Sequence, residues 1–553
     1  MDHSSLPSTE PRDGAGRHAF LAFSARRLIA LFALISLLLA LRFPEPLFRP
    51  WTFVNEEGTV FFQDAYNLGF WEAVFTPYAG YCTVAGRLLA AGCLWLPYRT
   101  LPFVYSFLSL LVAAAVFCFF YLPYFRRVVA SDWRRFAVCL GLCAAPAYPL
   151  LRLEMIHFYL AIWLALVVIM ELPPSGAGKA GLAAAAGVAI WSAPSAMVYL
   201  PLFLFRIVRR GISRAERAVW LLIAAISVGY LAHVWAGRQS RAEQIDAGHL
   251  FTTAWHAVAY RVVAVGLIGE KWADRLVSSF GWNAVLPLLL LVIALAALVL
   301  NMERRRGRPL FPLVALLWAI VATAALIVLR PDFSVTYVRF DPKYPYWPND
   351  RYFFPAAALL VLFFGAWLRL RGGTGKALAI LGACWCCSMC MWGYAFHPWN
   401  AWGPKFLPYS KQLEAAEREA VADGKIHKLI IPIASKSWLM TLEAGKKKHA
   451  YAAHQEIAPS TQKLTDFFDL DEDRPGLRHS TWFGAFDDAQ YPWLQHKTYG
   501  WMVCLGTATG GFWFWSKDLD AFWTAPWEFP RVYLSKTNNW ITLKPQPFAP
   551  SGR

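Results

Sequence analysis

The sequence predicts a helical protein that crosses a membrane about eleven times and ends in a small, mostly β domain of the α+β type. Hydrophobic residues make up 57% of the 553 residues and charged residues only 16%. With a mean hydropathy of +0.38, the chain is too apolar and too long for one soluble core. Apolar stretches near the ~20 residues that cross a bilayer recur along it. After Phe396 the composition becomes mixed polar and aromatic.

The apolar stretches define the expected membrane spans. They lie roughly at 24–43, 101–124, 136–151, 155–171, 178–192, 195–208, 218–236, 282–302, 309–329, 353–370 and 377–396. No small-x-small cleavage site follows the first stretch, so we interpret it as a retained anchor. Residues 1–23 are rich in Ser, Pro and Gly and are expected to form a disordered cytoplasmic tail.

Six basic clusters set the expected orientation. They are Arg26/Arg27, Arg126/Arg127/Arg134/Arg135, Lys179, Arg206/Arg209/Arg210/Arg214/Arg217, Arg304/Arg305/Arg306/Arg308 and Arg369/Arg371/Lys376. All fall on one side under this assignment, which the positive-inside rule makes cytoplasmic. An odd number of spans then carries residues 397–553 to the outer face of the membrane. The net charge of +17 comes largely from these anchors and gives little support to nucleic-acid binding.

Three outer loops, 44–100, 237–281 and 330–351, carry most of the unusual chemistry. The first holds the adjacent acids Glu56 and Glu57 directly after the first span, and ionisable groups at a membrane boundary indicate a functional site by default. Residues 64–75 have the spacing of an amphipathic helix lying along the interface. An aromatic turn ending at Tyr81 follows it.

The second and third outer loops add cations. The second contains several Arg, His and acidic residues followed by an apolar run too short to span, which predicts a re-entrant or interfacial helix. The third places Arg339, Lys343 and Arg351 among aromatic residues on the outer side. The positive-inside rule does not explain cations there, so we expect an anionic partner such as a phosphate.

Short motifs carry a resemblance to a known family. They are Trp51 to Asp64, the turn Pro77 to Tyr81, Glu154 to His157 opening a helix, Ser192 to Pro194 between two helices, and Asp350 to Pro355 opening another. With the topology of residues 24–396, this layout resembles bacterial integral-membrane glycosyltransferases of the C-type (GT-C) superfamily. The resemblance implies a polyprenyl-phosphate-linked sugar donor, an acidic residue in the first outer loop and an appended extracytoplasmic domain.

Sugar transfer from a lipid phosphate to a hydroxyl needs a carboxylate to accept the proton. Glu57 is the favoured base because Gly58 follows it and permits close approach of substrate. Glu56 and Asp64 are the other candidates, and which of the three acts is left open. The alternatives are a solvated loop acid for the Glu pair and a helix cap for Asp64.

The departing phosphate needs cations as its charge grows. Arg351 begins a span, where its guanidinium can grip a phosphate beside helix-start amides, and the alternative is an interfacial side chain that reaches water. His157 can bond phosphate or sugar hydroxyls, with an interhelical histidine as its alternative. The remaining candidates for substrate or phosphate binding are Arg152, Arg339, Lys343 and Tyr81.

The C-terminal segment 397–553 has the size of one domain. A helix is expected over 411–422 and strands over 429–433, 438–442, 501–505 and 540–543. Its tryptophans either fill a β core or form platforms for sugars. The cysteines between Cys384 and Cys390 match no usual zinc pattern, so no metal or other cofactor is predicted, although a divalent cation stays open.

Two other classes of function compete with the transferase. A lipid or polysaccharide transporter or flippase would show repeated halves and broken helices with charges at the bilayer midplane. A non-catalytic envelope assembly protein would leave the Glu pair and the outer cations unexplained. For the transferase, the expected partners are the polyprenyl-phosphate sugar, a glycan or glycolipid acceptor and membrane lipids.

Overall fold

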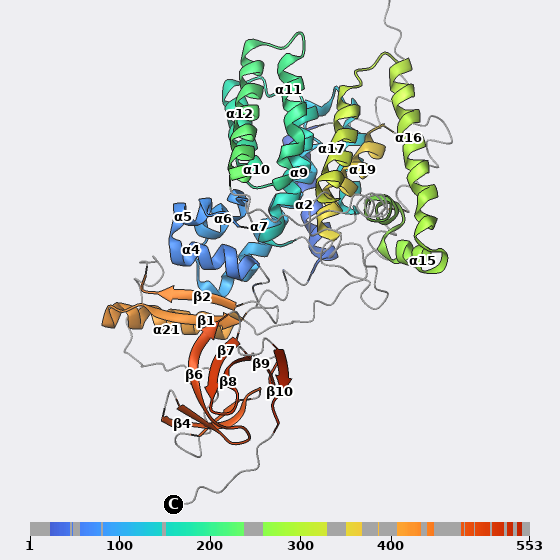
Figure 1. The fold of residues 1–553 in the computed structure, drawn as a ribbon. Helices are drawn as coiled ribbons and strands as arrows, with labels where there is room; N and C mark the ends of the chain where they lie inside the picture. Colours follow the sequence, from blue (N-terminus) through green and yellow to red (C-terminus); the bar gives the residue numbers. More distant parts are fainter. Residues whose placement is uncertain are drawn as a thin grey trace, which may run out of the picture. The chain divides into compact units, whose positions relative to one another are not determined.

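In a computed structural model of the chain, the protein is mostly helical and carries a sheet region near its C-terminus (Figure 1). The structure describes residues 23–44, 47, 53, 56–78, 81–145, 151–236, 258–328, 350–367, 385, 406–432, 439–446, 477–480, 482–490, 493–508, 511–524, 528–534 and 539–544. The chain divides into two compact units. Unit 1 is made of residues 1–50, 70–93 and 103–398, and unit 2 of residues 51–69, 94–102 and 399–553.

The named elements of unit 1 in its described residues are all helices. Its first half contains α2 (Ala25–Arg42), α5 (Phe70–Phe75), α6 (Val84–Gly92), most of α7 (Leu101–Phe119), η4 (Pro123–Phe125), α8 (Asp132–Cys143), η5 (Leu153–Met155), α9 (Ile156–Ile169), α10 (Gly176–Ile190), η6 (Pro194–Tyr199), α11 (Leu200–Val208) and α12 (Arg214–Ala236). Its second half contains η7 (Val258–Ala264), α14 (Val265–Ile268), α15 (Glu270–Phe280), η8 (Trp282–Val285), α16 (Leu286–Arg305), α17 (Phe311–Val328), η9 (Asp350–Phe353) and α19 (Phe354–Trp367).

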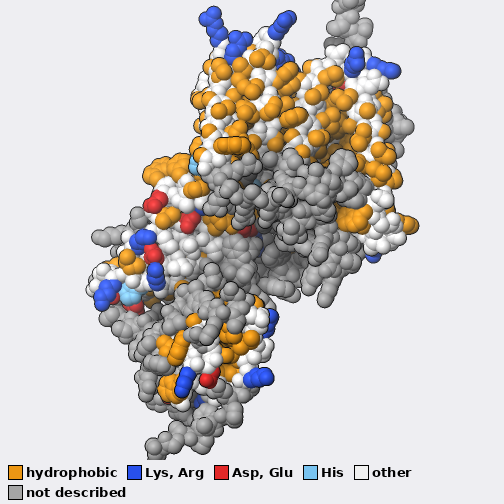
Figure 2. Space-filling model, viewed as in Figure 1, with side chains coloured by type: hydrophobic (Ala, Val, Ile, Leu, Met, Phe, Trp, Pro, Cys, Tyr) orange, Lys and Arg blue, Asp and Glu red, His pale blue; other side chains and the backbone are white. Residues whose placement is uncertain are grey.

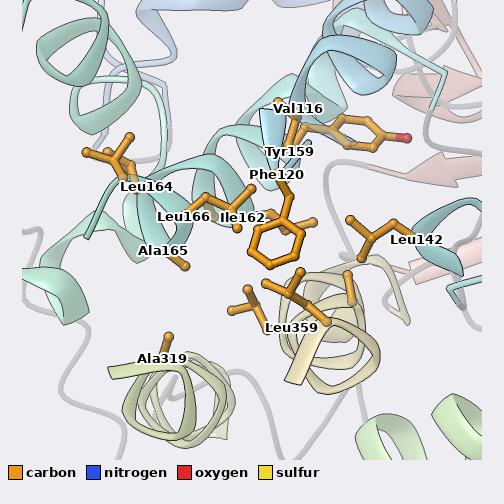
Figure 3. Close-up of a cluster of buried hydrophobic side chains, with 14 of the residues drawn as sticks. Val116, Phe120, Leu142, Tyr159, Ile162, Leu164, Ala165, Leu166, Ala319 and Leu359 are labelled. Carbon is orange, nitrogen blue, oxygen red and sulfur yellow. The ribbon is translucent and has the colours of Figure 1, made fainter. Parts of the chain in front are cut away.

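Helix α9 is the centre of unit 1. Its residues are apolar on every side and nearly all are buried, as expected of a helix surrounded by others. Around it, side chains from α7, α8, α17 and α19 close the core, and Figure 3 shows Ile162 and Leu166 of α9 among Phe120, Leu142 and Leu359.

Serine caps fix where several of these helices begin. Ser24, Ser131 and Ser175 each accept a hydrogen bond from a backbone amide in the first turn of α2, α8 and α10, which satisfies donors that the helix leaves unpaired. A glycine at positive φ separates α14 from α15, Gly269 at 81°, a backbone conformation that favours glycine.

Most of the expected spans coincide with helices of unit 1. Among the described residues, three helical segments are long and apolar enough to cross a membrane: Tyr98–Phe119, Arg214–Ala236 and Trp282–Arg305. The shorter apolar helices are Leu153–Ile169, Gly176–Ile190, Ser195–Val208, Val258–Ile268, Phe311–Ala325 and Phe354–Trp367. The expected span at 377–396 lies outside the described residues apart from residue 385.

Hydrophobic side chains lie over much of the described surface of unit 1 on the face that Figure 2 shows. On α12 and α16, Leu221 is 51% exposed, Leu222 52% and Leu290 56%. Only 28% of the apolar window of α12 and 17% of that of α16 are buried within the protein. This uncovered apolar surface is far more than scattered single residues on a soluble protein would give.

Unit 2 combines two short pieces of the predicted loop 44–100, residues 51–69 and 94–102, with the C-terminal segment. The loop contributes η2 (Glu57–Phe62), α4 (Gln63–Leu68) and η3 (Tyr98–Thr100), and the C-terminal segment begins with α21 (Phe406–Asp423). The antiparallel hairpin of β1 (His427–Pro432) and β2 (Leu439–Ala444) follows α21. The predicted helix at 411–422 and the predicted strands at 429–433 and 438–442 are confirmed, with boundaries shifted by a few residues.

The remaining strands form one antiparallel sheet in which sequence neighbours are spatial neighbours, in the order β10-β9-β8-β7-β6-β5-β4-β3. They are β3 (Leu477–Ser480), β4 (Gly484–Gln490), β5 (Trp493–His496), β6 (Gly500–Ala508), β7 (Gly511–Ser516), β8 (Asp520–Thr524), β9 (Arg531–Leu534) and β10 (Asn539–Thr542). The predictions at 501–505 and 540–543 are confirmed as parts of β6 and β10. One face of the sheet is packed by Phe486, Leu494, Phe514, Phe522 and Val532.

Glycines allow α8 and α19 to approach closely. A Cβ added at Gly365 would lie 3.0 Å from Val138 Cγ2, closer than ordinary van der Waals contact. We therefore expect Gly365→Leu to lower the free energy of unfolding by about 1–3 kcal/mol, the usual cost of overpacking a core. Gly181 on α10 is the matched control, because a Cβ there meets nothing within 4 Å. Thermal unfolding in detergent measures both variants, and equal midpoints would contradict the close packing.

Candidate functional site

The three candidate carboxylates lie on one stretch of helix in unit 2. Glu57 begins the π-helix η2, Glu56 immediately precedes it, and Asp64 follows in the continuous helix α4. The Glu57 side chain is 0% exposed, so the alternative of a solvated loop acid is wrong for it. Glu56 and Asp64 are half-buried. π-Helices are rare and occur frequently at functional sites.

Two expectations for this segment are wrong. Asp64 does not cap a helix start, because the helix already runs through residues 57–62 before reaching it. The predicted single helix over 64–75 is two helices, α4 and α5, separated by Gly69 at φ 88°. A left-handed glycine interrupts the helix at a position where the amphipathic spacing alone suggests continuity.

A fourth carboxyl group in unit 2, Glu417 of α21, has no counterpart in the sequence predictions. It is 4% exposed, and its Oε1 accepts hydrogen bonds from the hydroxyls of Tyr66 and Tyr98 at 2.6 and 2.7 Å. Burial raises the pKa of Glu417, and the two tyrosine hydrogen bonds oppose this shift only in part. No sequence signal distinguishes Glu417 from its acidic neighbours Glu414 and Glu419.

In unit 1 the basic clusters gather at one end of the helices, which we call the basic end. The Phe23 amide before α2 donates to Asp132 Oδ2 at 2.7 Å, and Arg126 pairs with the same carboxylate at 3.1 Å. Arg127 pairs with Glu171 just after α9.

Contacts of α11 extend this end further. Arg206 donates to the Met170 carbonyl at 3.0 Å, and Phe205 stacks on Phe311 with 4.8 Å between ring centroids, which brings the loop 306–310 beside it. Figure 2 shows Lys and Arg side chains at the tips of α11, α12 and α16. Four of the six clusters lie in these segments. Lys179 donates at 3.1 Å to the carbonyl of Pro174, three residues after Glu171, and the sixth cluster, Arg369 to Lys376, lies outside the described residues.

The opposite end of unit 1 holds the starts of α9 and α19. Helix α9 ends at the basic end, so its first turn lies about 20 Å away at ~1.5 Å per residue. There, Phe158 contacts Tyr352 edge-on, with 5.5 Å between centroids, and Tyr159 contacts Phe354 in the same way. The helix starts that carry His157 and the backbone of Arg351 are therefore neighbours.

Arg152 and His157 bracket the start of α9. Arg152 is half-buried at the N-terminal boundary of η5, and its carbonyl accepts a hydrogen bond from Ser109 at 3.0 Å. His157 Nδ1 lies 2.7 Å from the Glu154 carbonyl oxygen. A carbonyl can only accept, so Nδ1 carries the proton and Nε2 of the neutral ring is an acceptor. Neutral His157 can thus accept a hydrogen bond from a hydroxyl at Nε2, whereas a bond from Nε2 to phosphate requires the imidazolium.

Through α6, the predicted loop 44–100 reaches the end of unit 1 that holds the starts of α9 and α19. The predicted turn is confirmed, because the Tyr78 and Tyr81 backbones exchange hydrogen bonds of 2.8 and 3.1 Å, and half-buried Tyr81 packs against the core of unit 1. Helix α6 contacts η5 and α9. Its Ala85 amide donates to Ser192 Oγ at 2.7 Å, which joins it to the predicted junction between α10 and η6.

Unit 1 also contains two buried arginines, Arg87 and Arg261, for which the sequence predicted no role. Arg87 on α6 is 1% exposed and donates to the Ala73 carbonyl at 2.9 Å. Arg261 is 8% exposed in the π-helix η7, which contacts η9 and α19, and its guanidinium lies 4.8 Å from the Tyr260 ring centroid. Arg87 could have been identified from the sequence, because it is a single arginine within an apolar stretch.

The remaining predicted residues fall where side chains are not described. Arg339 and Lys343 lie outside the described residues, and for Arg351 the backbone alone is described, within η9. Cys384 and Cys386 to Cys390 also lie outside them. Within the described ranges, no group of three or more His, Cys, Asp or Glu side chains converges as metal ligands would.

Several tryptophans of the large sheet face away from its core. Trp523, Tyr533 and Trp540 are direct cross-strand partners on β8, β9 and β10. By strand alternation they lie opposite Phe522 and Val532. Trp540 is 37% exposed and Trp501 on β6 46%. Trp523, Tyr533 and Trp540 form an aromatic face through ring contacts with Trp540, while Trp482 packs against the phenylalanine core, so both predicted uses of tryptophan occur.

The comparisons with known proteins give no family. No protein-family model matches the chain, and no curated protein and no solved structure matches it.

The raised pKa of Glu417 predicts that the free energy of unfolding depends on pH. Because the folded state binds the proton more tightly than the unfolded chain, the stabilisation is complete below the ordinary Glu pKa and is lost as pH rises through the raised value. Glu417→Gln keeps an oxygen that accepts from both tyrosines but does not titrate. As pH rises, we expect the unfolding midpoint of the wild type to fall relative to that of this variant. Thermal unfolding across pH measures the difference, and parallel curves would contradict the buried proton.

Proposed function

We propose that this protein is an inverting membrane glycosyltransferase that moves a sugar from a polyprenyl-phosphate donor to a glycan or glycolipid acceptor of the cell envelope. The observation that carries the proposal is the gathering of Arg152, His157 and the start of α19 with Arg351 at the end of unit 1 opposite the basic loops. Cations at that end are not explained by the positive-inside rule and suit a phosphate.

The uncovered apolar surface of α12 and α16 supports a multi-pass membrane protein. In this proposal the basic end faces the cytoplasm, about eleven spans cross the inner membrane, and residues 397–553 lie in the periplasm. The GT-C-like assignment of the helical domain rests on the sequence motifs. The candidate donor is lipid-linked, because nucleotide sugars are made on the cytoplasmic side, away from the proposed active end.

In the proposed reaction, Glu57 takes the proton from the acceptor hydroxyl as its oxygen attacks the anomeric carbon of the sugar. The bond from that carbon to the phosphate oxygen breaks, and polyprenyl phosphate leaves with the bonding electron pair. Arg351, with Arg152, stabilises the charge that grows on the phosphate. His157 accepts a hydrogen bond from a sugar hydroxyl at Nε2. A single displacement of this kind inverts the anomeric configuration.

The burial of Glu57 supports its role as the base, because electrostatic interactions that accompany proton transfer are stronger in a site shielded from water. The aromatic face of the sheet supports a glycan as acceptor. Indole and phenol rings present flat apolar surfaces with a polar edge, which suits the apolar face and the hydroxyl rim of a sugar ring.

Glu57→Gln is expected to lower the rate of sugar transfer by about 10²–10⁴-fold, the typical contribution of a general base. Glu56→Gln, the matched neighbour, is expected to have a smaller effect. Transfer of labelled sugar from lipid phosphate to acceptor in isolated membranes measures both, with protein amount determined by immunoblot. Full activity of both single variants and of the double variant would move the base to Asp64.

Arg351→Ala is expected to weaken donor use more than Arg351→Lys. Lysine keeps the charge but loses the two-point grip of guanidinium on phosphate, so the lysine variant should be intermediate. The measurement is KM for the lipid-linked donor together with kcat. Wild-type kinetics in both variants would remove Arg351 from the phosphate site.

A further inference from the structure

The first-loop helix of unit 2 is held by the C-terminal hairpin through side-chain amides. Gln63 and Asn67 are four residues apart and therefore share one face of α4. The Thr441 amide donates to Gln63 Oε1 at 2.7 Å, and Asn67 Nδ2 donates to the Thr441 carbonyl at 2.7 Å. The Glu443 amide donates to Asn67 Oδ1 at 2.9 Å.

These contacts pair backbone groups on the edge of strand β2 that does not face β1. Strand β1 pairs with the other edge of β2 along its whole length, and unpaired strand edges present exposed amides and carbonyls. Gln63 and Asn67 satisfy these groups in place of a third strand. Because Asn67 both donates and accepts while Gln63 accepts one turn earlier, the match fixes the helix along the strand as well as against it.

Glu417 adds a second attachment on the α21 side. Its carboxyl oxygen joins Tyr66, one residue before Asn67, to Tyr98 of η3. Both tyrosines are 0% exposed, and their rings meet edge-on at 5.9 Å. Phe62 of the same helix packs against Phe406 at the start of α21, with 5.8 Å between centroids. Four hydrogen bonds thus run from residues 63–67 to the C-terminal segment.

We propose that Glu417 is a positioning residue, through which the C-terminal domain holds the helix 57–68 and its Glu57 carboxylate in the orientation that sugar transfer requires. The proposal rests on the proposed function, since it assumes Glu57 as base. It gives the C-terminal domain a part in the reaction besides contact with the acceptor. A general base displaced by about 1 Å can lose on the order of 10²-fold in rate.

The test compares Glu417→Leu, Glu417→Gln and Tyr66→Phe in the full-length protein. Leucine removes the acceptor from both tyrosines, glutamine keeps it, and phenylalanine removes one donor while keeping the ring. We expect kcat to fall about 10–100-fold in Glu417→Leu with KM for the donor within about threefold of wild type. Tyr66→Phe should fall less, and Glu417→Gln should restore nearly wild-type kcat near neutral pH.

Amide hydrogen exchange supplies a readout that does not depend on activity. Residues 57–68 should exchange faster in Glu417→Leu and in Tyr66→Phe than in wild type, while α9 of unit 1 should be unchanged. Unchanged exchange of residues 57–68 in both variants would overturn the attachment. Faster exchange with wild-type kcat would overturn the positioning role.

These results are distinguishable from failure of the proposed function. A wild-type protein that leaves lipid-linked sugars intact would overturn the transferase, and the positioning role with it. The exchange measurement would still report whether Glu417 holds the helix. If Glu417→Leu does not fold, Tyr66→Phe against Glu417→Gln carries the same comparison.

Discussion

The uncovered apolar surface of unit 1 is the constraint on which the rest of the arrangement depends. Along α12 and α16 the large exposed side chains are leucine, valine, isoleucine and tryptophan, and in the proposed bilayer a charged side chain there would be costly. Charge is therefore sorted to the two ends of the helices. One end collects the basic loops joined through Asp132, Glu171 and Met170. The other end collects Arg152, His157 and the start of α19, and this is where the proposed function places the phosphate of the donor.

Unit 2 follows a different rule, because two of its carboxyl groups are buried, and both have a place in the proposed reaction. Glu57 is buried within a π-helix, and Glu417 is buried against two phenol hydroxyls. An unpartnered carboxylate in such surroundings would cost several kcal/mol. Hydrogen-bond donors and a raised pKa offset this cost for Glu417. In the proposed positioning role, the same polar contacts hold the helix that carries Glu57.

The sequence predicted the features that depend on composition and local period. Long apolar runs located the helices from α2 to α19, and the hydrophobic runs around Ile430 and Met440 located the C-terminal hairpin. The basic clusters predicted which loops share an end, because their charge is a local property. The openings of α9 at Glu154 and of α19 at Asp350 were also visible as short motifs.

The features that the sequence did not predict depend on tertiary packing. The burial of Glu57 depends on which residues surround it, and its neighbour Glu56 is identical in type. The break at Gly69 requires a positive φ that an amphipathic pattern does not reveal. Strands β3 to β5 and β7 to β9 have only four to seven residues each, which is too few for a clear hydrophobic alternation. Glu417 is one acid among several on α21, and its importance comes from Tyr66 and Tyr98, which are more than 300 residues away in sequence.

The most direct test of the central claim is donor turnover by the purified protein. Radiolabelled polyprenyl-phosphate sugars and radiolabelled nucleotide sugars would be incubated separately with the protein in lipid nanodiscs, with envelope glycan as acceptor. The account predicts that a lipid-linked sugar is consumed and its label appears on the acceptor, while nucleotide sugars stay intact. Consumption of a nucleotide sugar with no turnover of any lipid-linked donor would contradict it.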